Sequence, residues 1–130
     1  MFLNRIPKNF RREKEKLGLK KINSWEGIKQ LSDDEILNLV RDEYCSSRNL
    51  RRLRCIALLV CELKLSENEA ALLMHSGIAS IKALLNLTPQ ELFLKTGRFE
   101  RLIKTGREPV ISLKRASELI RKAKIRQNIK

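Results

Sequence analysis

The sequence predicts an all-α fold, a compact bundle of short helices arranged as two tandem units. Three observations support this prediction. Apolar residues recur at helical spacing, and no stretch alternates for long at the period of a β-strand. Capping boxes, in which a Ser or Thr is followed three residues later by a Glu, mark helix starts at Ser32, Ser66 and Thr88. A segment near the start of the chain also recurs, without a gap, in the second half.

The caps and the apolar spacing predict five main helices. The capping boxes place helices at about 33–43, 67–75 and 89–95, and apolar spacing adds helices at about 48–64 and 112–127. The helix at 48–64 would bury one stripe: Leu50, Leu53, Ile56, Ala57, Val60 and Leu63. The last helix would bury Leu113, Ala116, Leu119, Ile120 and Ala123. Its outer face would be basic: Lys114, Arg115, Arg121, Lys122 and Arg126.

The internal repeat aligns residues 22–37 with residues 78–93. The capping box falls in the same register in both segments. Four pairs are identical: Ile22/Ile78, Ser24/Ser80, Leu31/Leu87 and Glu35/Glu91. We interpret the repeat as a duplication, with a degenerate first copy at about 21–64 and a better second copy at about 65–127. Chance similarity between helical segments is the alternative.

The second copy has the layout of a helix-hairpin-helix, so the two tandem units are predicted to be helix-hairpin-helix-like. Gly77 would end one helix in a left-handed conformation, Ile78 would plug the core, and Ser80 would cap the next helix. The amides of that helix's first turn, where Lys82 lies, could grip a phosphate. Gly77, Ser80 and Lys82 are therefore candidate phosphate-binding residues. An ordinary helix end with a surface lysine is the alternative.

The charge of the chain favours an anionic partner. Lys and Arg number 28 against 15 Asp and Glu, a net charge of +13. Residues 1–21 hold 8 basic and 2 acidic residues, residues 22–94 hold 8 and 10, and residues 95–130 hold 12 and 3. A near-neutral middle between two basic ends is typical of a protein that binds a polyanion, although solubility alone is the alternative. We expect residues 1–20 to be mobile alone and ordered on a partner.

Two further groups of cations are candidate phosphate contacts. The tetrapeptide Lys-Thr-Gly-Arg occurs twice, and we expect a glycine turn in each that presents an arginine beside backbone amides, with helix ends as the alternative. Arginines also crowd the start of the helix at 48–64, where the helix dipole disfavours them. They could pair with Asp42 and Glu43, or face an anionic partner. These candidates are Lys95, Arg98, Lys104, Arg107, Arg48, Arg51 and Arg52, and the last helix adds Lys114, Arg115, Arg121 and Lys122.

The sequence offers little to a catalytic, cofactor or metal site. It has no phosphate-binding loop, nucleophile motif or metal-ligand spacing, so we expect no enzyme, no cofactor and no bound metal. We expect His75 to be structural and Trp25 to lie in the core. Cys45, Cys55 and Cys61 form no CxxC pair, so we expect buried thiols in a reducing compartment.

Membrane insertion is also not expected. The longest uninterrupted apolar run has seven residues, far fewer than a membrane-spanning helix needs. We therefore expect a cytoplasmic protein that does not span a membrane. Peripheral contact with an anionic membrane surface stays open.

The run from Leu72 to Lys124 resembles a known family. The LLxHSGIAS hairpin, the TP-x-EL capped helix and the Pro109-Val110 start of the last helix are similar, over residues 70–125, to the helix-hairpin-helix-like family called domain of unknown function 4332, common in cyanobacteria. The resemblance implies a fold related to helix-hairpin-helix DNA-binding modules. It implies no activity.

A more distant likeness is to the C-terminal domain of the bacterial RNA polymerase alpha subunit. That domain reads GI-x-T-I-x-x-L and then T-x-x-E-L, in the same order as Gly77 to Leu92. It touches the DNA minor groove with an Arg and an Asn from the helix before the hairpin. The matching positions are Asn68 and Ala71, so neither contact is kept.

Two functions fit these observations. We interpret the chain as a noncatalytic module that binds DNA or RNA through backbone phosphates, with little sequence preference. The alternative is an adaptor whose helices dock on a larger complex, its basic ends gripping an acidic protein, RNA or an anionic membrane surface. The net charge favours the first function, and the missing base-reading residues favour the second.

Overall fold

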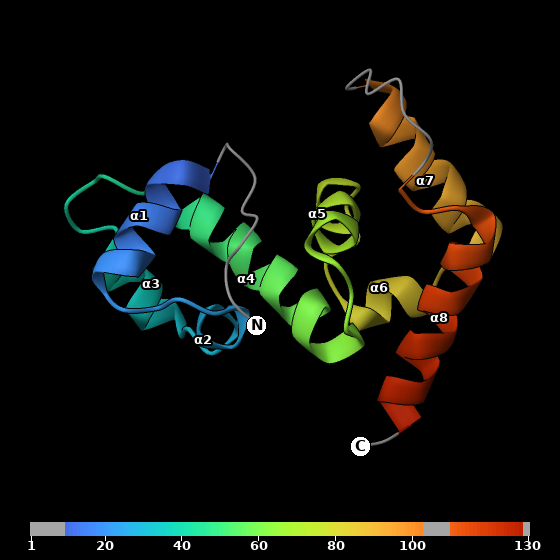
Figure 1. Cartoon of the computed structure of the whole chain (residues 1–130), viewed down its shortest axis with the longest axis horizontal. Helices are drawn as coiled ribbons and strands as arrows, with labels where there is room; N and C mark the ends of the chain where they lie inside the picture. The colour runs from blue at the N-terminus through green and yellow to red at the C-terminus, as the bar shows by residue number, and fades with distance from the viewer. Residues whose placement is uncertain (1–9, 103–109, 129–130) are drawn as a thin grey trace.

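All regular structure in the described part of the chain is α-helical, which confirms the predicted fold class. A computed structural model describes residues 10–102 and 110–128. The helices are α1 (Arg11–Leu19), α2 (Trp25–Lys29), α3 (Asp33–Leu39), α4 (Ser47–Leu63), α5 (Glu67–His75), α6 (Ile81–Leu85), α7 (Pro89–Leu102) and α8 (Leu113–Asn128). Figure 1 shows α4 as the connecting helix, with α1 to α3 at one end and α5 to α8 at the other.

Side-chain caps fix the starts of the helices where the sequence predicts them. The hydroxyls of Ser32 and Ser66 each accept from a backbone N–H three residues on, at 3.1 Å, and a Glu reaches back to each cap. Thr88 caps α7 in the same way, at 3.2 Å. One predicted end is wrong, because α3 stops at Leu39 rather than near 43: the chain turns away there, and Glu43 has a φ of 62°.

The first Lys-Thr-Gly-Arg segment is not a turn, so this prediction is also wrong. α7 continues through it to Leu102 instead of ending near 95. The buried hydroxyl of Thr96 donates to the carbonyls of Leu92 and Phe93 at 3.0 and 3.2 Å, so it is satisfied within the helix. A single interior glycine costs about 1 kcal/mol, too little to break a helix that packs on its neighbours. The second tetrapeptide, at 104–107, lies outside the described residues.

The register of the sequence repeat, in which Ile22 matches Ile78, also relates the helices. In this register both ends of α1 coincide with those of α5, and both ends of α2 coincide with those of α6. The hairpin hydrogen bonds match as well: Ile22 N–H donates to Leu17 at 2.9 Å, and Ile78 N–H donates to Leu73 at 2.8 Å. The repeated unit therefore begins no later than α1, earlier than the predicted start at residue 21.

The fourth helix of each unit follows a longer offset. Ser46 caps α4 and Ser112 caps α8, and in the register that aligns these two caps Leu53 matches Leu119, both of them fully buried. The additional residues fall within α7, which is longer than α3, and in the segment before α8. These correspondences support a duplication of four helices.

The segment 10–19 belongs to the folded core, contrary to the mobility predicted for the chain up to Lys20. Phe10 and Leu17 are fully buried, and Glu13 is 3% exposed. Phe10 and Leu17 lie seven residues apart, two helical turns, so they share the face that packs on the core. The basic residues of the segment are exposed, except Lys16, which is half-buried. The prediction for residues 1–9 lies outside the described residues.

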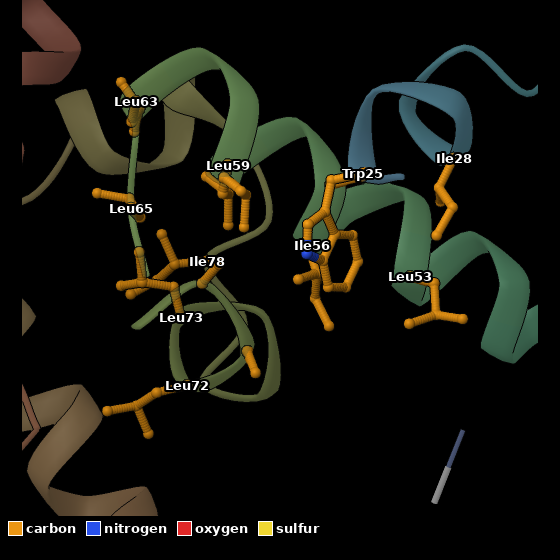
Figure 2. Packing of buried hydrophobic residues seen from close by; sticks show 14 of the residues in the cluster. Trp25, Ile28, Leu53, Ile56, Leu59, Leu63, Leu65, Leu72, Leu73 and Ile78 are labelled. Carbon is orange, nitrogen blue, oxygen red and sulfur yellow. The ribbon is translucent and has the colours of Figure 1, made fainter. Parts of the chain in front are cut away.

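The core follows the predicted stripes with one exception. All six residues predicted for α4 are buried, and Trp25 is 1% exposed beside Ile56 of α4 (Figure 2). Leu113, predicted to be buried, is 45% exposed, because it stands at the first position of α8, and Ile111 takes the core position just before the cap. Of the thiols, Cys45 is buried, while Cys55 and Cys61 are only half-buried.

The two hairpins share a left-handed backbone position but place different residues there, which gives a testable contrast. Gly77 has a φ of +88° with open space around its Cα, and Lys21, its counterpart, has a φ of +61°. We expect Lys21→Gly to raise the free energy of unfolding by about 0.5–1 kcal/mol and Gly77→Ala to lower it by about 1 kcal/mol. Urea titration measures both changes. A shift of the same sign in both variants would contradict the left-handed conformation.

Candidate nucleic-acid interface

The predicted phosphate contacts are spread over several elements. They lie in the hairpin before α6 and on α4, α6, α7 and α8, while Lys104 and Arg107 lie outside the described residues. The structure neutralises some of these cations and leaves others exposed. The cations therefore differ in how available they are to a phosphate.

The turn before α6 forms as predicted, but one amide of the first turn of α6 is already bonded to the cap. Ser80 caps α6, and its hydroxyl accepts from the Ala83 N–H at 3.1 Å. With five residues, α6 is too short to build a substantial dipole. Gly77 and Lys82 are exposed. An ordinary turn accounts for the geometry, and phosphate binding by Gly77 and Ser80 stays a prediction.

The arginines at the start of α4 divide into two pairs. The carboxylate of Asp33 forms ion pairs with Arg54, at 2.9 Å, and with Arg51, at 3.1 Å. The hydrogen bonds and charges of these two arginines hold the pKa of Asp33 below its ordinary range, and Arg54 contributes most. The predicted alternative, pairing with Asp42 and Glu43, is wrong: α3 presents Asp33 to these arginines, and Asp42 binds Lys16 from α1.

Arg48 and Arg52 make no ion pair with another described residue. They lie one helical turn apart on α4, so their charges repel each other slightly, and the helix dipole adds to the cost. The nearby N-terminus of α4 is not open to a phosphate, because Glu13 occupies it. The carboxylate of Glu13 accepts from the backbone N–H of Ser46 at 3.1 Å and from the side-chain amide of Asn49 at 3.3 Å. An internal anion already occupies that position.

His75 has a structural setting. Its ring stacks on Phe10 with centroids 6.2 Å apart. Burial lowers the pKa of His75, and the charge of Arg52 lowers it further, so the imidazole is neutral at pH 7. No group of His, Cys, Asp and Glu residues that could hold a metal occurs within 10–102 and 110–128.

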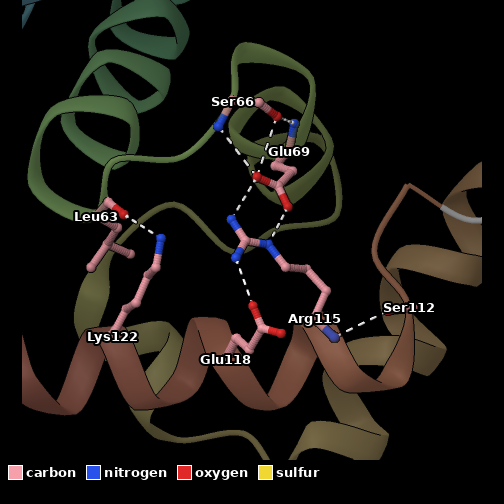
Figure 3. Close-up of polar contacts among 7 residues, drawn as sticks. All are labelled: Leu63, Ser66, Glu69, Ser112, Arg115, Glu118 and Lys122. Carbon is pink, nitrogen blue, oxygen red and sulfur yellow. Dashed lines mark hydrogen bonds and ion pairs between the residues drawn. The ribbon is translucent and has the colours of Figure 1, made fainter.

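Three cations predicted on the outer face of α8, Arg115, Lys122 and Arg126, turn toward the protein. Arg115 binds Glu69 of α5 through two hydrogen bonds, at 2.6 and 3.0 Å, and also binds Glu118 at 3.0 Å (Figure 3). Lys122 donates to the carbonyl of Leu63 at 3.4 Å, near the end of α4. Arg126 binds Glu62 of α4. The prediction of exposure is wrong for all three cations, because α5 and α4 present acceptors on this side of α8.

The Glu69–Arg115 pair is charged and internally satisfied. Burial would raise the pKa of Glu69, but hydrogen bonds from Arg115 and Ser66, with the charge of Arg115, bring it below the ordinary value of 4.5. The same pair raises the pKa of Arg115. Arg115 therefore neutralises a carboxylate of its own chain, which leaves it a poor candidate for binding phosphate.

Three cations of α8 line one depression. Lys114 and Arg121 are exposed, and with Lys122 they line a hollow of about 520 Å³, which we call the basic hollow. Its other lining residues are Ser117 and Glu118, and Glu118 is engaged by Arg115. Positive charge therefore dominates the basic hollow.

Helix α7, which packs against α8, carries two exposed cations. The two helices pack side by side in Figure 1. Lys95 and Arg98 are exposed on α7, three residues apart and so on the same side of the helix. Neither makes an ion pair with another described residue.

The sequence comparisons identify the family. The sequence model of one family matches residues 7–126, nearly the whole chain. The chain belongs to the family named domain of unknown function (DUF4332). The match extends the resemblance from residues 70–125 to both units of the DUF4332 chain. No curated protein and no solved structure matches it. The cyanobacterial type and the polymerase likeness stay predictions.

Sequence reasoning missed the acidic residues that order this DUF4332 protein. Glu13 and Glu69 occupy equivalent positions of the repeat, and both are buried. Each accepts a hydrogen bond from a residue at the start of a later helix, Glu13 from Ser46 and Glu69 from Arg115. Extending the repeat alignment upstream of residue 22 would have found them.

No described helix is long and apolar enough to cross a membrane, which agrees with the predicted absence of a span.

Proposed function

We propose that this DUF4332 protein binds nucleic acid through backbone phosphates, with the basic hollow of α8 as its central contact. The observation that carries the proposal is the gathering of Lys114, Arg121 and Lys122 around one hollow. Lys114 lies in the first turn of α8, where a cation is unfavourable for the helix, so helix stability does not explain it.

The geometry suits a chain of phosphates better than a single small anion. Lys114 and Arg121 lie seven residues apart, about 10 Å along the helix axis, so they can contact successive phosphates of one strand. Lys95 and Arg98 are exposed on α7, which packs against α8, and they would add further phosphate contacts. Lysine and arginine contacts to phosphate carry no sequence information, so the proposed binding has little sequence preference.

The double variant Lys114→Glu with Arg121→Glu tests the proposal. We expect the affinity for a short labelled duplex DNA at low salt to fall about tenfold or more, because two phosphate contacts are replaced by repulsion. Fluorescence anisotropy measures the affinity. The matched control is Lys14→Glu with Arg41→Glu, which replaces one lysine and one arginine on exposed positions of the α1–α3 end.

The control separates a local contact from general attraction by the net charge. Both double variants have the same net charge, so an equal loss of affinity would overturn the role of the basic hollow. If the wild-type protein binds neither duplex nor single strands at low salt, the proposed function is wrong. Capture of partners from native lysate with and without nuclease would then test the adaptor.

A further inference from the structure

A second hollow lies where α4, α6 and α8 meet. It has a volume of about 410 Å³ and three apolar lining residues, Leu58, Ile81 and Leu85. Its polar lining residues are Glu62, Lys82, Arg126 and Gln127. We call it the apolar hollow. It shares no lining residue with the basic hollow, and its volume is within the range of ligand pockets.

The duplication shows what kind of side chain this position accommodates. Trp25 and Ile81 are equivalent, because each is the first residue of a five-residue helix capped by a serine. Trp25 is 1% exposed and packs its indole beside Ile56 of α4 (Figure 2). Ile81 is smaller, is only half-buried and lines an open hollow. The second unit therefore lacks the aromatic ring that closes the first.

The charges around the apolar hollow are predominantly positive. Glu62 binds both Lys29 and Arg126, so one carboxylate is shared by two cations. Lys82 is exposed and makes no ion pair with another described residue. Lys82 and Arg126 therefore leave an uncompensated positive charge beside the apolar wall.

We propose that the apolar hollow binds an aromatic side chain presented by an acidic segment of a partner protein. The ring would cover Leu58, Ile81 and Leu85, as Trp25 covers its own side of α4, and removal of this apolar surface from water would drive binding. Carboxylates beside the ring would meet Lys82 and Arg126. This protein-binding site is separate from the proposed nucleic-acid surface, because Arg126 lies about 18 Å along α8 from Lys114.

Three peptides test the proposal by NMR titration of the full chain. The first is a pentapeptide with a central tryptophan flanked by glutamates, the second replaces the tryptophan by alanine, and the third replaces the glutamates by lysines. We expect the first peptide to shift the backbone amide signals of Ile81, Lys82, Leu85 and Arg126, and to bind about tenfold more tightly than either of the others.

Two variants locate the binding. Ile81→Trp should fill the apolar hollow from within and weaken the first peptide about tenfold, while Ile125→Trp, on an exposed position of α8 outside the hollow, should leave its affinity unchanged. If Ile81→Trp does not fold, Lys82→Glu on the exposed face of α6 replaces it and should weaken the same peptide.

Four results would overturn the proposal. If the alanine peptide binds as tightly as the first peptide, surface lysines attract acidic peptides without a contribution from the aromatic ring. If the lysine peptide binds as tightly as the first peptide, or if the first peptide shifts no signal, the apolar hollow does not bind an aromatic side chain of an acidic segment. Shifts of the same amides with single-stranded DNA but not with the peptide would assign the apolar hollow to nucleotide bases.

Discussion

Replacing Glu69 with alanine is expected to lower the free energy of unfolding by about 3–5 kcal/mol, because Arg115 would lose its main partner while half-buried. The side chains of Glu69 and Arg115 are 11% and 26% exposed. The change also removes the Glu of a capping box. Glu35→Ala removes the same box position in α3, where Glu35 is exposed and makes no ion pair with a described residue, so it should cost about 1 kcal/mol.

The dependence of stability on pH gives the same prediction an independent measurement. The pKa of Glu69 is lower in the folded protein than its ordinary value of 4.5, so the unfolded state binds more protons in this range. The contribution of Glu69 is therefore complete above about pH 4.5 and is lost as the pH falls through the folded pKa. Urea titrations should show that the free energy of unfolding falls less between pH 7 and pH 3.5 for Glu69→Ala than for the wild type. An equal loss would mean that the pair does not stabilise the fold.

The second large effect is expected in α1. Leu17→Ala should cost about 2–5 kcal/mol, because Leu17 is fully buried and its removal leaves a cavity. Leu19→Ala provides the control on the same helix, because Leu19 is 79% exposed, and it should change stability by about 0.5 kcal/mol or less. Equal midpoints of unfolding in urea for the two variants would show that α1 does not pack on the core.

Features fixed by local chemistry could be predicted from the sequence. A capping box needs only residues within one turn, so the starts of α3, α5 and α7 follow from Ser32, Ser66 and Thr88. Helix ends depend on more distant packing. The predicted end of α7 is misplaced because the sequence predicts a turn at Gly97, yet the helix continues through it and the adjacent Thr96 is buried and bonded within the helix.

The partners of the cations could not be predicted from periodicity. Helical spacing places Arg115 and Lys122 on a face of α8, but it does not show which acceptors the neighbouring helices present to that face. Glu69 lies 46 residues from Arg115, and the carbonyl that binds Lys122 lies 59 residues away. Similarly, the many cations of α1 suggest a mobile basic segment, although the buried Leu17 matches Leu73 in the register of the repeat.

The salt dependence of nucleic-acid binding tests the proposed function most directly. Each neutralised phosphate contributes about −0.9 to the slope of log K against log salt on duplex DNA. We expect a wild-type slope of about −4 or steeper, from Lys95, Arg98, Lys114, Arg121 and Lys122, and a slope about 2 units shallower for Lys114→Glu with Arg121→Glu. A wild-type slope near zero, or one that the double variant leaves unchanged, would contradict phosphate binding at the basic hollow.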